Sequence, residues 1–385
     1  MADRVGIVAI AKTKYEEAKP RVELAELALE AVERVIEQSG LAFKDDSTGI
    51  DASVTCSQDH WDGRTISGES VVNVAGGHMR PDCKVADDGA LAAYYAMMQI
   101  LSGKFDIVLV VAHTKESQTE GRLIENVGFD AIYYAPLGID FLSAAAMQAN
   151  RYMHRYGISP EQCARIAVKN RRNAKNNPLS QQAGDLRVED VLASEVLAHP
   201  IRLLDAKPVS DGACAMILAT EGKARRFTDR PVWIRGVGSC YDTHHLGDRD
   251  LADCSSLTLA AQRAYAVAGI ADPLKEISVA EISEYYSYQE LLWMEGLGLC
   301  GKGEAGKLVD GGSTEMDGQL PVNASGGLLA GVPVNVAGLD RIAEAALQLR
   351  GEAGAHQVPG AKVALAHGTS GACGQLHCVL ILEKE

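Results

Sequence analysis

Short apolar runs alternate along the chain with longer segments in which apolar residues recur every three or four positions. One run covers 4–15 and is followed by the Ala- and Leu-rich segment 23–41, and another covers 231–241 and is followed by the similar segment 257–270. Short β-branched runs predict strands, whereas a period near 3.6 predicts amphipathic helices. Strands that alternate with helices in this way predict an α/β protein built from parallel βαβ units.

The second half of the chain repeats the order of the first. After the first helix of each half comes a second predicted strand, at 51–58 in the first half and at 277–289 in the second. The next segment of the first half, 83–114, matches three pieces of the second half taken together, which are 321–329, 339–354 and 361–372. Because several matches occur in the same order, and about 230 residues separate them, they indicate a duplicated domain and not a solenoid. The predicted domains are an N-terminal half over 1–115 plus 206–225, an inserted loop domain over 116–205, and a C-terminal half over 226–385.

Charge and composition exclude several classes of function. The formal net charge is −14, which argues against a nucleic-acid binder, whose affinity comes from Lys and Arg on phosphates. No apolar run approaches the ~18 residues of a membrane span. The nine cysteines form no CxxC pair, so we expect no metal site in this chain. We also expect the cysteines to be reduced thiols in a cytoplasmic protein. No GxGxxG follows a predicted strand, which makes nicotinamide chemistry improbable.

The predicted insertion contains a helix start and a basic cluster. Ser159 begins the sequence SPEQ, in which the Ser and the Gln three residues later form a capping-box pattern with Pro at the first helical position. Basic residues follow within one predicted helix: Lys169, Arg171, Arg172 and Lys175. They are either a solvated helix face or a site for the phosphates of a long cofactor.

Four segments of the chain carry a family resemblance. They are VSDGACAMILAT (209–220), GLGLCGKGEAGKLVDGG (296–312), LPVNASGGLLAG (320–331) and QLRGEAGAHQV (348–358). Together with the duplication they resemble the thiolase superfamily, most closely its sterol-carrier-protein type and the archaeal and bacterial relatives of that type. The resemblance implies two βαβ-rich halves in a five-layered α/β/α/β/α body, usually dimeric, and acyl-CoA thioester substrates.

The chain departs from the family at all four catalytic positions. The nucleophilic Cys at the start of a buried helix aligns with Ala86, and the His of the family's Gly-His-Pro loop aligns with Val332. Ser283 stands at the polar oxyanion position, and the second Cys aligns with Ala364. Alanine cannot be acylated and valine cannot move a proton, so the chain cannot work as a cysteine-dependent thiolase does with these residues.

Two catalytic explanations and one non-catalytic explanation remain. We expect first a thiolase-type cleavage of a β-oxoacyl-CoA, in which Cys83 reaches the reaction centre, Glu284 serves as base and Cys373 contributes from the last segment. The alternative is a retro-aldol cleavage of a β-hydroxyacyl-CoA without an acyl-enzyme, in which Glu284 and Tyr286 transfer protons. A non-catalytic scaffold would have a collapsed tunnel and no affinity for coenzyme A.

Further residues belong to the predicted site. Asp87 either caps a helix or faces the active site, and His367 either supports the core or takes part in chemistry. By resemblance, coenzyme A contacts are expected at Arg171, Arg172, Ser210, Ser325, Gly326 and Gly327. Relatives of this type often pair with a small zinc-ribbon/OB-fold subunit, so we expect a homodimer within such a heteromeric complex.

Overall fold

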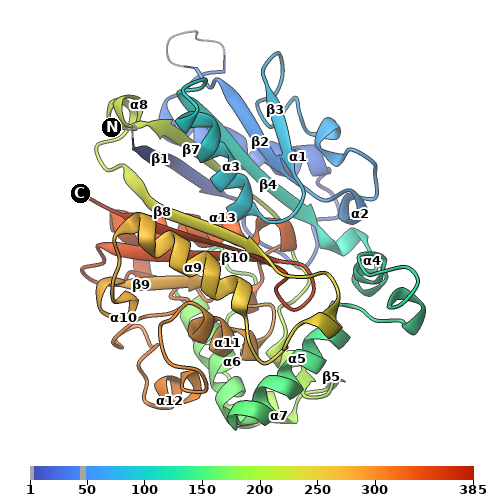
Figure 1. Ribbon diagram of the computed structural model, residues 1–385. Helices are drawn as coiled ribbons and strands as arrows, with labels where there is room; N and C mark the ends of the chain where they lie inside the picture. The colour runs from blue at the N-terminus through green and yellow to red at the C-terminus, as the bar shows by residue number, and fades with distance from the viewer. Residues whose placement is uncertain (1–3, 44–48) are drawn as a thin grey trace.

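The computed structural model describes residues 4–43 and 49–385, and its largest feature is a mixed sheet (Figure 1). The strand order is β3-β2-β4-β7-β1-β8-β11-β10-β9. The first five strands are β1 (Val5–Lys12), β2 (Ala52–Cys56), β3 (Asp82–Val85), β4 (Ile107–Lys115) and β7 (Asp211–Thr220). The other four are β8 (Val232–Tyr241), β9 (Val279–Ile282), β10 (Val363–Ser370) and β11 (Leu376–Glu383). The predicted start of the N-terminal half at residue 1 lies outside the described residues.

Four helices cover this sheet in layers. They are α1 (Leu24–Ser39), α3 (Gly89–Leu101), α9 (Ser255–Ala268) and α13 (Ala337–Arg350). One buried cluster joins α1 to the outer face of β1, β4 and β7, and another joins α9 to the outer face of β10 and β11. A third contains α3, α13 and the inner faces of strands from both halves. Three apolar interfaces between helices and strands produce the five-layered α/β/α/β/α thiolase-like body, as predicted.

The same strand order runs through both groups of strands. Parallel pairing joins β2 to β3 and β4, and likewise β9 to β10, while the other described pairs are antiparallel. The sheet is therefore mixed, unlike the all-parallel units expected from the alternation of elements. The two groups meet where Gly6 pairs with Trp233 and Ile7 with Val232. A Cβ on Gly6 would lie 2.9 Å from the Trp233 ring, so this close junction requires glycine.

Predicted and observed elements differ mainly after β9. The helical segments 23–41 and 257–270 form α1 and α9 with ends shifted by one or two residues. The expected strand 277–289 was too long, because the sheet stops at Ile282 and α11 (Ser287–Gly296) begins after a loop. After Ile282 the loop meets β10 through side chains, since Ser283 Oγ donates to His367 O and Tyr285 Oη donates to Thr369 O, while Glu284 accepts from Asn170 and Asn323 outside the sheet.

The segment predicted to be an insertion, 116–205, packs as a helical layer against elements of residues 226–385. Its elements are α4 (Gly121–Val127), α5 (Phe141–Tyr156), α6 (Pro160–Ala174), α7 (Val188–Ala193), β5 (Val196–Ala198) and β6 (Ile201–Arg202). The predicted capping box is confirmed, since the Ser159 side chain accepts from Gln162 N at the start of α6. Within the ranges 4–43 and 49–385, no helix combines the length and apolarity that crossing a bilayer requires.

Candidate active site

Loops from both halves and from the insertion meet at one place, between α3 and α13. The contacts that join them are Gly338 N with Asp88 Oδ2, Ser283 Oγ with His367 O, Tyr285 Oη with Thr369 O, and Val334 N with Glu116 Oε1. Residues far apart in the sequence therefore share one site at the ends of the strands.

A carboxylate stands at the helix start where the family resemblance implies a thiolate. Asp88 Oδ1 accepts from Ala90 N at 2.8 Å, and Asp88 Oδ2 accepts from Gly338 N at 2.9 Å. One buried side chain thus caps the N-termini of both central helices, α3 and α13. Burial raises the pKa of Asp88 to about 7. Ala86, two residues earlier, offers no nucleophile.

Removing this double cap has a measurable cost. We expect Asp88→Ala to lower the free energy of unfolding by about 2–4 kcal/mol, because each lost cap costs about 1–2 kcal/mol. Urea unfolding followed by circular dichroism measures the change. Asp87→Ala is the matched control, since the Asp87 carboxylate accepts from the Tyr241 hydroxyl (2.6 Å) and caps neither helix. Equal stability of the two variants would contradict the double cap.

The structure does not favour either cysteine named from the sequence as a nucleophile. Cys83 lies away from the start of α3, and the thiol of Cys373 is not ionised. Cys83 is on the edge strand β3, and its Sγ faces Gln99 Nε2 (3.5 Å) and Tyr95 Oη (3.9 Å) on later turns of α3. Ten residues separate Gln99 from Gly89, which is about 15 Å along a helix. Cys373 is in the hairpin loop between β10 and β11, and burial raises the pKa of its thiol to about 12.

Glu284 is bonded on both carboxylate oxygens. Asn170 Nδ2 donates to its Oε1 and Asn323 Nδ2 donates to its Oε2, each at 2.9 Å, and Leu329 N donates to Oε1 at 3.3 Å. Burial, followed by the neighbouring Glu290, raises the pKa of Glu284 to about 8. Because both of its oxygens already accept hydrogen bonds, the Glu284 carboxylate is better placed to hold the glycine-rich turn than to act as a base.

The glycine-rich turn needs the space that its glycines leave. Gly326 and Gly327 have φ values of 104° and 64°, in the region that favours glycine. A Cβ on Gly327 would lie 2.0 Å from Glu284 Oε1. Ser325 donates through Oγ to Glu281 Oε2 at 2.6 Å, so its hydroxyl is already bonded within the protein.

A largely buried ion pair links the loop after Val332 to the loop of residues 283–286, here called the tyrosine loop. Lys207 Nζ lies 2.9 Å from Glu116 Oε2, and Glu116 also accepts from Val334 N at 2.6 Å and from Ser210 N at 3.0 Å. The backbone N–H of Lys207 donates to Tyr285 O at 2.9 Å. The pair therefore holds the loop after Val332, the predicted contact Ser210 and the tyrosine loop in one arrangement.

A second carboxylic acid, Glu125 on α4, was not predicted from the sequence. Phe141 N donates to its Oε2 at 3.2 Å, and burial raises the pKa of Glu125 to about 7. After burial, the charges of Asp88, Glu116 and Glu125 raise the pKa of the Tyr285 hydroxyl, and the charge of Glu125 raises the pKa of the Tyr286 hydroxyl. The signal that could have revealed it is an acid within the apolar and aromatic stretch 123–142.

Tyr286 and His367 have different surroundings. The Tyr286 ring stacks on Tyr288 with centroids 6.3 Å apart, and within the described residues its hydroxyl makes no hydrogen bond. His367 Nε2 lies 2.9 Å from His377 Nδ1 beside Trp293, and burial lowers the pKa of His367 to about 3. This neutral histidine pair therefore packs in the core.

The basic cluster of α6 divides into paired and unpaired cations. Lys169 pairs with Glu290, Arg172 with Glu315, and Lys175 with Asp185. Arg171 is buried and donates to Gln182, without a carboxylate partner among the described residues, and burial lowers its pKa to about 10. Of the two arginines predicted to contact phosphate, Arg172 is paired with a carboxylate, whereas Arg171 is not and has N–H groups left to donate.

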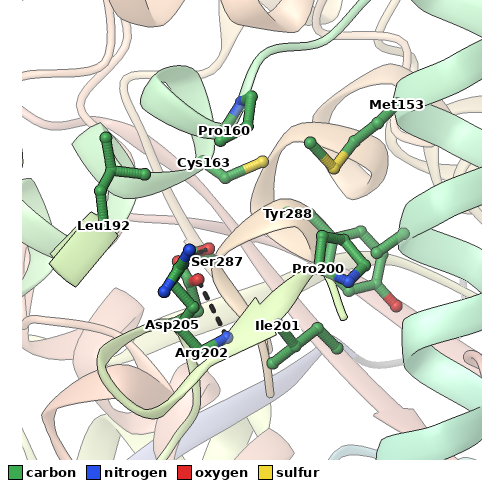
Figure 2. A pocket seen from close by; sticks show the side chains of 11 residues that line it. Met153, Pro160, Cys163, Leu192, Pro200, Ile201, Arg202, Asp205, Ser287 and Tyr288 are labelled. Atoms are coloured by element: carbon green, nitrogen blue, oxygen red, sulfur yellow. Dashed lines mark hydrogen bonds between the residues drawn. The ribbon is translucent and has the colours of Figure 1, made fainter. Parts of the chain in front are cut away.

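A pocket lies directly beside the tyrosine loop (Figure 2). Its empty volume is about 350 Å³, and its walls come from α5, α6, α7, β6 and α11: Ala149, Met153, Pro160, Cys163, Leu192, Pro200, Ile201, Arg202, Asp205, Ser287 and Tyr288. Asp205 accepts from Ser287 Oγ at 2.7 Å and from Arg202 N at 3.2 Å, which gives the apolar pocket one polar wall. Since Ser287 follows Tyr286, the pocket adjoins the site without forming it.

Comparisons with known proteins show what the chain as a whole is similar to. Residues 238–384 match the family model described as "Thiolase C-terminal domain-like". An acetyl-CoA acetyltransferase of Methanothermobacter thermautotrophicus is 33% identical over 96% of this chain and 97% of its own. A 17-hydroxy-3-oxo-4-pregnene-20-carboxyl-CoA lyase of Mycobacterium tuberculosis is 30% identical over 91% of this chain and 92% of its own. The solved Ltp2-ChsH2(DUF35) aldolase has a TM-score of 0.84 at 26% identity, covering 99% of this chain and 97% of that one.

Proposed function

Because this chain belongs to the thiolase superfamily and is a thiolase-like acyl-CoA enzyme, we propose that it cleaves a β-hydroxyacyl-CoA by a retro-aldol step. The observation that carries the proposal is the replacement of the nucleophile: Ala86 and the buried Asp88 carboxylate occupy the start of α3. A retro-aldol step needs no acyl-enzyme, only a base, a proton donor and donors for the enolate oxygen.

The residues near the tyrosine loop supply the proton transfers. The Glu125 carboxylate takes the proton of the β-hydroxyl, and the electrons of that O–H bond form a carbonyl as the Cα–Cβ bond breaks. The electrons of the broken bond form the thioester enolate, and the Tyr286 hydroxyl donates a proton to its α-carbon. Return of a proton from Glu125 to the Tyr286 oxygen restores both groups. A pKa of about 7 suits Glu125 to this exchange.

Thiolysis through Cys83 remains the second candidate, and the placement of the thiol weighs against it. Its Sγ contacts Gln99 and Tyr95, which lie well beyond the first turn of α3. The oxygens of Glu284, the expected base, accept from Asn170, Asn323 and Leu329. A thiolytic mechanism would require both side chains to leave these partners.

The deciding experiment compares the two substrate classes. We expect the purified enzyme to convert a β-hydroxyacyl-CoA to a shortened acyl-CoA and a carbonyl compound without added coenzyme A, as followed by liquid chromatography. Cys83→Ala should retain activity within about twofold, and Tyr286→Phe should lose about a hundredfold or more. Cleavage of a β-oxoacyl-CoA that depends on free coenzyme A and on Cys83 would establish thiolysis instead.

We also propose a small partner protein, as in the solved Ltp2-ChsH2(DUF35) aldolase, and we expect it to be a zinc-ribbon/OB-fold subunit bound to a homodimer. The segment that carries Glu125 exposes five large apolar side chains, each 67–78% accessible: Leu123, Val127, Ile132, Tyr133 and Leu137. Such an exposed apolar patch is typical of a surface that binds a partner protein.

Because all nine cysteines are free thiols, we propose that the complex lies in the reducing cytoplasm. Co-expression with a neighbouring gene of this type, followed by size-exclusion chromatography, tests the assembly.

A further inference from the structure

The loop between β10 and β11 is held from one side by a single guanidinium. Arg249 Nη1 donates to Ala372 O at 2.9 Å, and Arg249 Nη2 donates to Cys373 O at 2.7 Å and to Gly374 O at 3.2 Å. Only 6% of the Arg249 side chain is accessible, and its Nε lies 3.7 Å from Asp242 Oδ2. Three consecutive carbonyl groups thus converge on one buried cation.

This convergence sets the direction of the opposite backbone groups. In a trans peptide the C=O of one residue and the N–H of the next point in opposite directions. The carbonyls of residues 372–374 face Arg249, so the N–H groups of residues 373–375 face away from it. Gly374 N is bonded to Gly371 O at 3.2 Å inside the loop, whereas Cys373 N–H has no acceptor in the described part of the chain.

The backbone of the loop is held in a tight, left-handed conformation. Gly371, Cys373 and Gly374 have φ values of 76°, 55° and 65°. Cys373 holds this conformation without being glycine, which requires support from its surroundings. Gln148 Nε2 adds a further bond to Cys373 O at 3.2 Å.

The loop also contacts both sides of the candidate site. Tyr288 Oη donates to Gln148 Oε1 at 2.8 Å, which connects the loop to the tyrosine segment. The side chains of Ala372 and Cys373 are buried in one cluster with Phe129 and Ala144, and Phe129 follows the helix that carries Glu125. A shift of the loop would therefore move groups on both sides of the substrate.

We propose that Arg249 is a positioning residue that turns the Cys373 N–H toward the thioester oxygen, where the negative charge of the enolate develops. This inference rests on the proposed function, because it requires an enolate. A guanidinium fork can bind three carbonyls at once, which the ammonium of lysine cannot do with the same geometry. Loss of an aligned backbone donor typically lowers anion stabilisation by about 10²–10³-fold.

The test measures binding of two ligands to the full chain by calorimetry, without turnover. The ligands are acetyl-CoA, which represents the ground state, and a coenzyme A thioether that ends in a nitronate, which carries the charge of the enolate. For Arg249→Gln we expect the Kd of acetyl-CoA to stay within about twofold and the Kd of the nitronate to rise about a hundredfold. Arg249→Lys should weaken nitronate binding about tenfold. Arg151→Gln, at an exposed arginine that pairs with Asp250, should change neither.

The outcomes of this test separate failure of the positioning role from failure of the proposed function. Nitronate binding by Arg249→Gln as tight as by the wild type overturns the positioning role. Equal weakening of both ligands in the Gln and Lys variants also overturns it, because a merely structural residue would act on both. If Arg249→Gln does not fold, the ratio of the two Kd values in Arg249→Lys decides in the same way. Failure of the wild-type chain to bind the nitronate more tightly than acetyl-CoA contradicts the proposed function itself.

Discussion

Glu125→Gln is expected to slow cleavage of the β-hydroxyacyl-CoA by about a hundredfold to ten-thousandfold, with little change in KM. Glutamine keeps the size and the hydrogen bond from Phe141 N but cannot accept the hydroxyl proton. The wild-type rate should rise with pH through about 7, because only the deprotonated carboxylate accepts a proton and burial raises the pKa of Glu125 to that value. The variant should lack this rise. Steady-state rates between pH 5.5 and 9 measure both effects.

The control for this prediction is Glu120→Gln, an exposed glutamate just before α4, which should leave the profile unchanged. Stability offers a second check. Since the pKa of Glu125 is higher in the folded chain than in the unfolded chain, the native state loses stability as pH rises between about 4.5 and 7. The glutamine variant should therefore melt no lower than the wild type at pH 8. If Glu125→Gln keeps more than a tenth of the wild-type rate at pH 8, another residue must be the base.

Arg341→Met should cause the largest loss of stability, about 3–5 kcal/mol. Arg341 lies on α13 beneath the glycine-rich turn, with Nη1 2.6 Å from Glu281 Oε2 and 2.9 Å from Ser325 Oγ, and with Nη2 on Asp340. Methionine fills much of the space but leaves the buried Glu281 carboxylate without its cation. Differential scanning calorimetry with urea unfolding measures the loss.

The pH dependence of this loss identifies its cause. Burial raises the pKa of Glu281, and removing Arg341 takes away the charge that lowers it. The folded variant will bind a proton at Glu281 more tightly than the unfolded chain, so its deficit should shrink as pH falls toward 4.5 and grow above it. The double change Arg341→Met with Glu281→Leu should recover most of the stability, because it removes both charges. A deficit independent of pH would indicate lost packing alone.

Local patterns were sufficient to predict most of the framework. The helices α1 and α9 and the capped start of α6 depend on apolar spacing and on the Ser159–Gln162 pair, which are properties of neighbouring residues. The strand expected over 277–289 failed beyond Ile282. There, the buried amides of Asn170 and Asn323 bond Glu284, and a local pattern contains no information about such partners.

The candidate site was predictable only in part. The resemblance to the family predicted that the tyrosine loop belongs to the site and that Ala86 replaces the nucleophile, and it drew attention to Cys83, which lies three residues before Ala86. In the fold, Cys83 turns toward Gln99 on the flank of α3, since successive residues of a strand face opposite sides. Arg249 lies in a loop without periodicity, so nothing in its local sequence sets it apart, and Glu125 on the short helix α4 is marked only by the apolar and aromatic stretch around it.

The sequence by itself determined the family and the duplicated α/β architecture, because hydrophobic period, capping pairs and aligned motifs are short-range information written along the chain. Only the tertiary structure decided which groups surround the candidate site. A carboxylate acquires a pKa near 7, or a loop a fixed direction, through burial and through partners hundreds of residues away, as at Asp88 with Gly338 and at Arg249 with the 372–374 carbonyls. Those distances exist only after the layers have packed.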